Sequence, residues 1–382
     1  MIDSSSYLFF FIATAATNLV ASAIAKGEDS DRIVSEALFL ALCSGLFLGG
    51  SVIVAGRPLL SIIAGEASAS VVPSALKYAL VRAFAQPCVL LASVARAAAL
   101  AEKDTRGPLI SVAIAFTLNI IGTLTLVRSF SMGITGAGFG TLCADIASTV
   151  YLLSRIRRER KKKAKDGGRT VTPLLVVPSK DSFRRFMRYA APIFFAILGK
   201  SAVYTGVALS VGRLGSVALA AHQVLLQSFF FLCPIGDSVS MTSQVFLPGI
   251  LAEEKRTGLQ PGGAKTLLFG TGVAAGLVAA ALAGLLPSKG AALFTTDATV
   301  AAALRQTAPM LGLCVSMHAI ALTCEGMLLA QRDLEFLSNS FIITTIATIG
   351  LLVGPTRPTS LGGSWWILTL FLGSRAVQCK CS

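Results

Sequence analysis

The amino-acid sequence predicts an all-α polytopic membrane protein with eleven transmembrane helices. Of its 382 residues, 54% are hydrophobic and 14% are charged, and the mean hydropathy is +0.74. An average soluble domain carries about 25% charged residues, so a bilayer is the solvent that suits this chain. Long apolar segments and the placement of the basic residues support the same fold class.

The apolar segments predict helices one after another along the chain. Each is about long enough to cross the hydrocarbon core, which takes about 20 apolar residues in a helix. Strict alternation of polar and apolar residues is absent, which excludes a transmembrane barrel. The segments are Tyr7–Ala25, Ala37–Ile63, Leu76–Leu100, Leu109–Val127, Met132–Leu153, Phe186–Val211, Val217–Leu251, Thr266–Leu286, Ala301–Ala330, Phe336–Val353 and Gly362–Val377.

The basic residues predict how these helices are oriented. The net charge is +14, from 33 Lys and Arg against 19 Asp and Glu. Most Lys and Arg lie after the first, third, fifth, seventh and ninth segments and in the C-terminal tail. Such loops stay on the cytoplasmic side, so the tail is expected inside and Met1 outside. Because no signal peptide explains an outside N-terminus, we expect one more helix before Met1.

Internal similarity predicts two parallel repeats of one six-helix unit. The string LAEKD at Leu100–Asp104 recurs as LAQRD at Leu329–Asp333, and TGAG at Thr135–Gly138 corresponds to SLGG at Ser360–Gly363. We therefore expect an N-lobe over residues 1–154 with five of six helices, a linker over 155–180, and a C-lobe of six helices over 181–382.

The predicted linker begins with a strongly basic run. Arg155–Arg169 contains nine basic and two acidic residues. A solvated, inside-facing linker that fixes topology is the main interpretation, and contact with anionic lipid head groups is compatible with it. Nucleic acid is not an expected partner, because no aromatic residues or folded binding module accompany the run.

Motifs of enzymes and ATP-driven pumps are missing from the sequence. There is no Walker A motif, no H-E-x-x-H, and no nucleophile elbow in a suitable context. Two histidines offer no His-rich metal site. We therefore expect a secondary transporter that is not an enzyme and that uses no cofactor apart from H+ or Na+ as the coupling ion.

Carboxylates within the apolar segments are the candidates for ion coupling. An unpaired charge at the middle of a bilayer costs at least about 2.5 kcal/mol. The candidates are Glu325, Asp237 and Asp145. Glu325 and Asp237 have two interpretations: exchange of a proton or sodium ion, or a static ion pair in which Lys200 binds one of them.

Asp237 also follows Pro234 and Gly236, which we expect to break or kink the helix and expose backbone groups to a cavity.

Further polar residues are candidates for a substrate cavity. Lys200 has the charge to attract an anionic substrate, and His222 is expected to hydrogen-bond between packed helices more than to relay protons. The candidates are Lys200, Tyr204, His222, Gln223, Gln244, Asn119, Arg82 and His318.

Several strings resemble the multidrug and toxic compound extrusion (MATE) family, most closely the plant and algal plastid-type branch that includes a salicylate exporter of the chloroplast envelope. They are AAPIF at Ala190–Phe194, LAAHQVLLQSFFF at Leu219–Phe231, GDSVSMTSQVFLPGIL at Gly236–Leu251, VRAFAQP at Val81–Pro87 and CEGMLLAQRDLEF at Cys324–Phe336.

The resemblance implies two six-helix lobes in a V around a central cavity, with the present first segment matching the second of twelve family helices. It implies a monomer that exports small organic solutes across a lipid bilayer by H+ or Na+ antiport and rocker-switch alternation. The chloroplast envelope or another organellar membrane is implied, with the plasma membrane as the alternative. Lys200 stands on the helix where many members carry an acid, which favours anionic aromatic substrates, whereas Glu325 matches an acidic position of the tenth family helix.

Two alternatives remain open at this point. One is a transport-inactive or structural membrane protein from a truncated gene. The other is a lipid-linked oligosaccharide flippase of the same superfamily, which would need several cations in the cavity of both lobes. Only Lys200 and Arg82 are available for that purpose.

Overall fold

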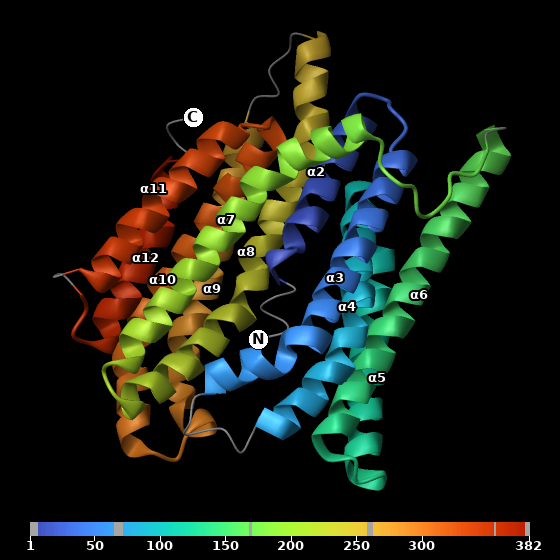
Figure 1. Ribbon diagram of the computed structural model, residues 1–382. Coiled ribbons are helices and arrows are strands. Elements are labelled where there is room, and N and C mark those ends of the chain that lie inside the picture. The colour runs from blue at the N-terminus through green and yellow to red at the C-terminus, as the bar shows by residue number, and fades with distance from the viewer. Residues whose placement is uncertain (1–6, 65–71, 168–169, 258–262, 355–356, 379–382) are drawn as a thin grey trace. The chain divides into compact units, whose positions relative to one another are not determined.

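The computed structural model describes residues 7–64, 72–167, 170–257, 263–354 and 357–378. Within these ranges the chain forms helices and no strands (Figure 1). Each of the eleven predicted segments overlaps one α-helix, and a short π-helix follows α5. The helices are α2 (Phe10–Ala25), α3 (Asp31–Ala64), α4 (Val72–Ala101), α5 (Arg106–Leu124), η2 (Thr125–Ser129), α6 (Gly133–Gly167), α7 (Lys180–Gly212), α8 (Ser216–Thr257), α9 (Ala264–Phe294), α10 (Ala298–Gln331), α11 (Leu334–Val353) and α12 (Leu361–Gln378).

The helices have the length and surface of membrane spans. In the described part of the chain, nine of them, α3 to α11, are long and apolar enough to cross a bilayer. The two end helices are shorter, with 16 residues in α2 and 18 in α12. Large apolar side chains point outward, as Leu109 (70% exposed) and Phe231 (75% exposed) illustrate. Such a surface suits lipid and not water, so the predicted all-α polytopic membrane fold is confirmed. Met1 and the C-terminal tail, which carry the predicted orientation, lie outside the described residues.

The chain divides into two compact units, Met1–Ala191 and Pro192–Ser382, with the boundary inside α7. The basic run at the start of the predicted linker is not a loop. Residues 155–167 continue α6 as helix, and Arg160 among them is buried, whereas most of the other basic residues of the run are exposed. The physical reason is that unit 1 supplies acidic and carbonyl partners for one face of this extension.

Small residues let helices approach closely within the first unit. The spacing of Gly45 and Gly49 places both on one face of α3, where a Cβ atom would lie 2.5 Å from Pro87 Cα and from Ala83 O of α4, respectively. Close backbone contact of this kind is how helices associate where lipid removes the hydrophobic drive between them.

In the second unit, α10 is the most buried span, with 72% of its apolar window inside the protein. Gly236 of α8 fits against Ala319 of α10, where an added Cβ would meet the Ala319 Cα at 2.7 Å. Of the break or kink predicted at Pro234 and Gly236, the break is wrong, because α8 is continuous from Ser216 to Thr257, whereas a kink stays a prediction. A single proline removes one donor, and the neighbouring turns keep their hydrogen bonds. Gly236 thus serves helix packing and not a break.

The repeated LAEKD and LAQRD strings share one backbone conformation and one capping hydrogen bond. Lys103 and Arg332 both adopt a left-handed conformation, with φ of 63° and 64°, within two residues of the ends of α4 and α10. The aspartate that follows then accepts hydrogen bonds from the first turn of the next helix: Asp104 from the Gly107 N–H at 3.1 Å and Asp333 from the Phe336 N–H at 3.3 Å. Each string is therefore a compact helix-to-helix corner.

Candidate functional site

A buried ion pair joins α7 to α10 in the second unit. The Lys200 Nζ donates to both carboxylate oxygens of Glu325, at 2.8 Å to Oε2 and 3.1 Å to Oε1. Lys200 is 8% exposed and Glu325 is 9% exposed. Of the two partners that the sequence offered Lys200, the structure brings Glu325 to it.

Arg375 of α12 completes this group and was missed by the sequence analysis. Its guanidinium lies 3.9 Å from Glu325 Oε2, over the ring of Phe341 from α11. Lys200 Nζ is 5.3 Å from the centre of the same ring. The available signal was an arginine within the predicted segment Gly362–Val377, near its end, where arginines commonly reach the membrane surface instead. We call Lys200, Glu325, Phe341 and Arg375 the charge cluster.

The charge cluster holds two cations and one carboxylate. All three charged side chains are buried, so their interaction is stronger than it would be in water. Both Glu325 oxygens face the Lys200 ammonium, as in the static ion pair that was one interpretation of the sequence. In the described part of the chain no group of three or more His, Cys, Asp or Glu residues could hold a metal ion.

Asp237 and His318 form a second, looser pair in the same unit. Their nearest atoms, Asp237 Oδ1 and His318 Nε2, are 3.8 Å apart, and the Asp237 side chain is 59% exposed. The His318 ring packs edge-on against Phe229, with 5.1 Å between ring centres. Tyr204 contacts Phe229 as well, at 5.9 Å.

His222 packs but does not hydrogen-bond as expected. Its ring centre lies 5.7 Å from that of Trp365, and neither ring nitrogen has a hydrogen-bond partner among the described residues. Gln244 is buried and donates to the Ser240 hydroxyl at 3.3 Å, whereas Gln223 is exposed. The structure therefore leaves these predicted cavity residues in separate environments.

The first-unit candidates form pairs of their own. Arg82 of α4 donates to Asp145 of α6 at 2.7 Å. Asn119 of α5 donates to the Thr141 hydroxyl of α6 at 2.8 Å. Asp145 thus takes part in an ion pair between neighbouring helices.

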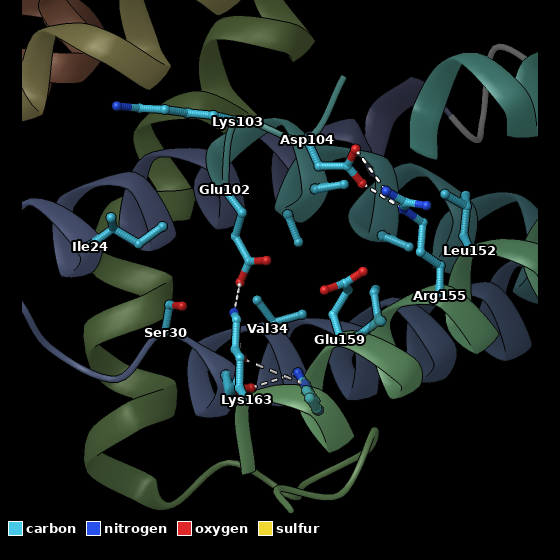
Figure 2. Close-up of a pocket in the computed structure, with 16 residues that line it drawn as sticks. Ile24, Ser30, Val34, Glu102, Lys103, Asp104, Leu152, Arg155, Glu159 and Lys163 are labelled. Atoms are coloured by element: carbon cyan, nitrogen blue, oxygen red, sulfur yellow. Dashed lines mark hydrogen bonds and ion pairs between the residues drawn. The ribbon is translucent and has the colours of Figure 1, made fainter. Parts of the chain in front are cut away.

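A cavity of about 520 Å³ opens in the first unit among the ends of α2, α3, α4 and α6 (Figure 2). Apolar side chains, among them Ile24, Val34 and Leu152, line the cavity together with charged side chains at its rim. Figure 2 shows two ion pairs on the rim, Asp104 with Arg155 and Glu102 with Lys163. Acidic and basic groups alternate there, so the rim selects neither charge.

Outside the spans, the Asp104 carboxyl has a shifted pKa. Partial burial would by itself raise this pKa, but hydrogen bonds from the Arg155 side chain and from backbone N–H groups outweigh burial and lower it. Asp104 therefore links the corner after α4 to α6 in its ionised form.

These features define a polytopic α-helical membrane protein with a duplicated helix order and a buried charge cluster in its second unit. The MatE family model matches residues 1–125 and 192–355, and the chain belongs to this family.

Among curated relatives, Arabidopsis thaliana Protein DETOXIFICATION 47, chloroplastic, is 28% identical over 98% of this chain and 68% of its own length. Arabidopsis thaliana Protein DETOXIFICATION 42 is 25% identical over 90% of this chain, which spans 64% of that relative. Bacillus cereus Probable multidrug resistance protein NorM is 24% identical over 90% of this chain and 75% of its own length.

Solved structures share the fold. A MATE crystal structure in complex with MaD5 has a TM-score of 0.80 at 15% identity, covering 98% of this chain and 82% of the other. A MOP superfamily transporter from Pyrococcus furiosus, described for the reverse polarity of its binding pocket, has a TM-score of 0.74 at 15% identity, covering 98% and 83%. The predicted MATE resemblance is thereby confirmed.

Proposed function

We propose that this protein is a secondary active transporter that exports small organic anions, aromatic ones included, with transport coupled to an ion gradient. Membership of the MatE family and relatives named as detoxification and multidrug resistance proteins support export of organic solutes. The chloroplastic relatives support a plastid membrane as its location.

The observation that carries the proposed substrate class is the charge cluster. Lys200 and Arg375 are two buried cations beside one carboxylate, so the cluster has an excess positive charge. An organic anion that enters this part of the second unit can replace the Glu325 carboxylate as the partner of Lys200. A cationic drug meets repulsion at the same place, because buried like charges are costly to bring together.

The charge cluster also favours H+ over Na+ as the coupling ion. A sodium site needs several oxygen ligands without a competing cation nearby. Both oxygens of Glu325 already accept hydrogen bonds from Lys200, and Arg375 lies 3.9 Å away. A proton needs only the carboxylate itself, so protonation of Glu325 is the simpler coupling event.

Solute movement can be coupled to H+ movement in two ways. Exchange of solute for H+ by rocker-switch alternation is the form that the family resemblance implies. The Lys200–Glu325 contact favours a second form, in which the proton and the anion bind together. A proton on Glu325 releases Lys200, and the released ammonium then binds the anion, so each step promotes the other.

The alternatives have less support. A lipid-linked oligosaccharide flippase would need cations for pyrophosphate in both halves, whereas Arg82 in the first unit is already paired with Asp145. Buried charges lower the stability of a protein. In an inactive or structural protein no transport function would offset this loss of stability.

The decisive experiment is flux through proteoliposomes that contain the protein, measured with salicylate and with a cationic dye under pH gradients of either sign. We expect salicylate to move in preference to the dye and to respond to the gradient. The sign of the gradient that accelerates efflux distinguishes exchange from joint movement.

Two pairs of variants, each with a matched control, test which residues carry the ion coupling and the preference for salicylate. Glu325→Gln should abolish the dependence on the pH gradient, whereas Glu253→Gln at an exposed site should not. Lys200→Gln should reduce the preference for salicylate over the dye, whereas Lys265→Gln, also exposed, should leave it unchanged. Equal gradient dependence in Glu325→Gln and wild type would exclude coupling at Glu325. Preferred transport of the dye by wild type would overturn the anion assignment.

A further inference from the structure

Helix α6 is longer than a bilayer is thick. Its 35 residues span about 52 Å at 1.5 Å per residue, whereas the hydrocarbon core is about 30 Å. Arg157 lies about 36 Å along the axis from Gly133, and Lys165 about 48 Å. The last turns of α6 therefore leave the hydrocarbon core and pass through the level of the lipid head groups.

One face of this extension is used by the fold of unit 1. Arg155 binds Asp104 with 2.7 Å between Nε and Oδ2, and Lys163 binds Glu102 at 3.2 Å (Figure 2). Both basic residues line the cavity rim together with Arg160. This face is held against the corner after α4.

Arg160 fixes the rotation of the helix. Its guanidinium, 2% exposed, donates to the Asp31 carbonyl at 2.8 Å, to the Ser35 hydroxyl at 2.9 Å and to the Pro173 carbonyl at 2.9 Å. These partners lie on α3 and on the chain that follows α6. The helix cannot turn about its axis without losing all of them.

The opposite face carries five exposed cations. At about 100° per residue they fall within a sector of about 140°, centred opposite the face that contains Arg155, Arg160 and Lys163. The acidic residues of the run, Glu159 and Asp166, fall on the side that faces unit 1. Among the described residues, none of the five cations is in an ion pair with an acid. The five are Arg157, Arg158, Lys161, Lys162 and Lys165.

We propose that these five residues, called the basic face, bind the phosphate groups of anionic lipids in the leaflet where α6 leaves the membrane. The basic face continues directly from a membrane span, so the lipid head groups are its nearest neighbours. Its charge is complementary to theirs, and its orientation is fixed by Arg160. Even Lys165 lies only about 12 Å along the axis beyond Arg157, slightly more than one Debye length of 8–10 Å. This inference is independent of the transported solute.

The test uses the full-length protein in phosphatidylcholine vesicles with spin-labelled phosphatidylglycerol or spin-labelled phosphatidylcholine. Electron paramagnetic resonance gives the relative association constant of the two lipids with the protein. Each basic residue near an anionic surface contributes about fivefold, so replacing all five by Gln should lower the preference for phosphatidylglycerol by at least about fivefold, the contribution of one residue. Salt at about 1 M should lower it in the wild type, because the Debye length falls to about 3 Å.

Two control variants separate the basic face from general charge. Exchanging Lys for Arg and Arg for Lys at the five positions preserves charge and should preserve the lipid preference. Replacing Arg57 of α3, Lys77 of α4, Arg128 of η2 and Arg213, which follows α7, by Gln gives the distant-cation variant. It removes four exposed cations that lie outside the basic face and should leave the preference within about twofold of wild type. An unchanged preference in the five-residue Gln variant, with the protein still monodisperse, would overturn the proposal. An equal loss in the distant-cation variant would overturn it as well.

Discussion

Glu325 lies closer to the Lys200 ammonium than to the Arg375 guanidinium. This difference in distance determines how much each substitution lowers the free energy of unfolding. Lys200 binds both carboxylate oxygens, whereas Arg375 lies 3.9 Å from one of them and over the Phe341 ring. Removing the carboxylate leaves Lys200 and Arg375 facing each other in a buried region. Removing Lys200 leaves the carboxylate with Arg375 nearby.

We therefore predict that Glu325→Gln destabilises the protein by about 3–5 kcal/mol, and that Lys200→Gln costs about 2 kcal/mol less. The double variant Lys200→Gln/Glu325→Gln should lie between the two single variants, because it leaves one buried cation, Arg375, without the Glu325 carboxylate. Thermal unfolding in detergent measures all three, with exposed Glu253→Gln as the control that changes stability by less than about 0.5 kcal/mol. A Lys200→Gln variant less stable than Glu325→Gln would contradict this account of the cluster.

Asp104 gives a pH dependence whose sign is fixed. Hydrogen bonds from Arg155 and from backbone N–H groups lower its pKa in the folded state below the ordinary value of about 3.9, despite partial burial. A group with a lowered folded pKa contributes stability above its unfolded pKa, and this contribution is lost as the pH falls through the folded value.

Asp104→Asn should therefore lower the melting temperature at pH 6, by an amount that corresponds to about 0.5–1 kcal/mol. The difference from wild type should shrink below about pH 3.9. Asp181→Asn, at an exposed acid in the first turn of α7, is the control. A difference that stays constant from pH 6 to below pH 3.9 would show that the lost charge is not the cause.

The sequence identified Lys200, Glu325 and Asp237 as charges that apolar segments should not contain, and this logic led to the buried pair. Sequence could not choose between Glu325 and Asp237 as the partner, because that choice depends on how α7 and α8 pack on α10. Arg375 was not predicted to belong to the charge cluster, because an arginine near the end of an apolar run usually lies at the membrane surface. Its burial depends on Phe341, which is distant in the sequence.

At the scale of the helices, glycines in α3 distinguish contact from lipid exposure. A Cβ on Gly49 would lie 2.5 Å from Ala83 O, whereas a Cβ on Gly50 would meet nothing within 4 Å. The two residues are adjacent and share one helix, so they form a matched pair.

Gly49→Ala should force α3 away from α4 and cost about 1–3 kcal/mol. Gly50→Ala should be neutral or stabilise by up to about 1 kcal/mol, because alanine favours the helix. Thermal unfolding of the two variants side by side tests the packing. Equal stabilities would mean that α3 and α4 are not in close backbone contact at this level.

The eleven apolar segments predicted the helices well because a membrane span can be recognised from its apolar composition. The extension of α6 was not predicted, since a basic run after a span has the composition of a solvated loop. Its helical form depends on Asp104, Glu102 and Asp31, which reach it from other parts of unit 1. The repeat of LAEKD and LAQRD was visible in sequence, but its physical basis, a left-handed residue followed by a capping aspartate, required backbone angles.

At the scale of the whole molecule, the two units repeat a helix order but not the same chemistry. The helices α4, α5 and α6 recur in order as α10, α11 and α12. In the first unit Arg82 and Asp145 balance each other, at 2.7 Å. In the second unit two cations surround one carboxylate. The order of the helices thus recurs, while the charges inside the two units differ.

This difference between the units leads to a prediction that rests on the proposed transport of organic anions. The preference for anions should depend on the charge cluster of the second unit and not on the ion pair of the first. The double variant Lys200→Gln/Glu325→Gln should lose the preference for salicylate over a cationic dye in proteoliposomes, because it removes the Lys200 ammonium that binds the organic anion. The double variant Arg82→Gln/Asp145→Asn removes a balanced pair and should keep the preference, even if its total flux falls. Both variants keep overall charge, and comparing their flux ratios at matched protein amounts cancels differences in stability. If the first-unit variant lost the salicylate preference as fully as the second-unit variant, the preference would not be specific to the charge cluster, and the assignment of anion selectivity to that cluster would be wrong.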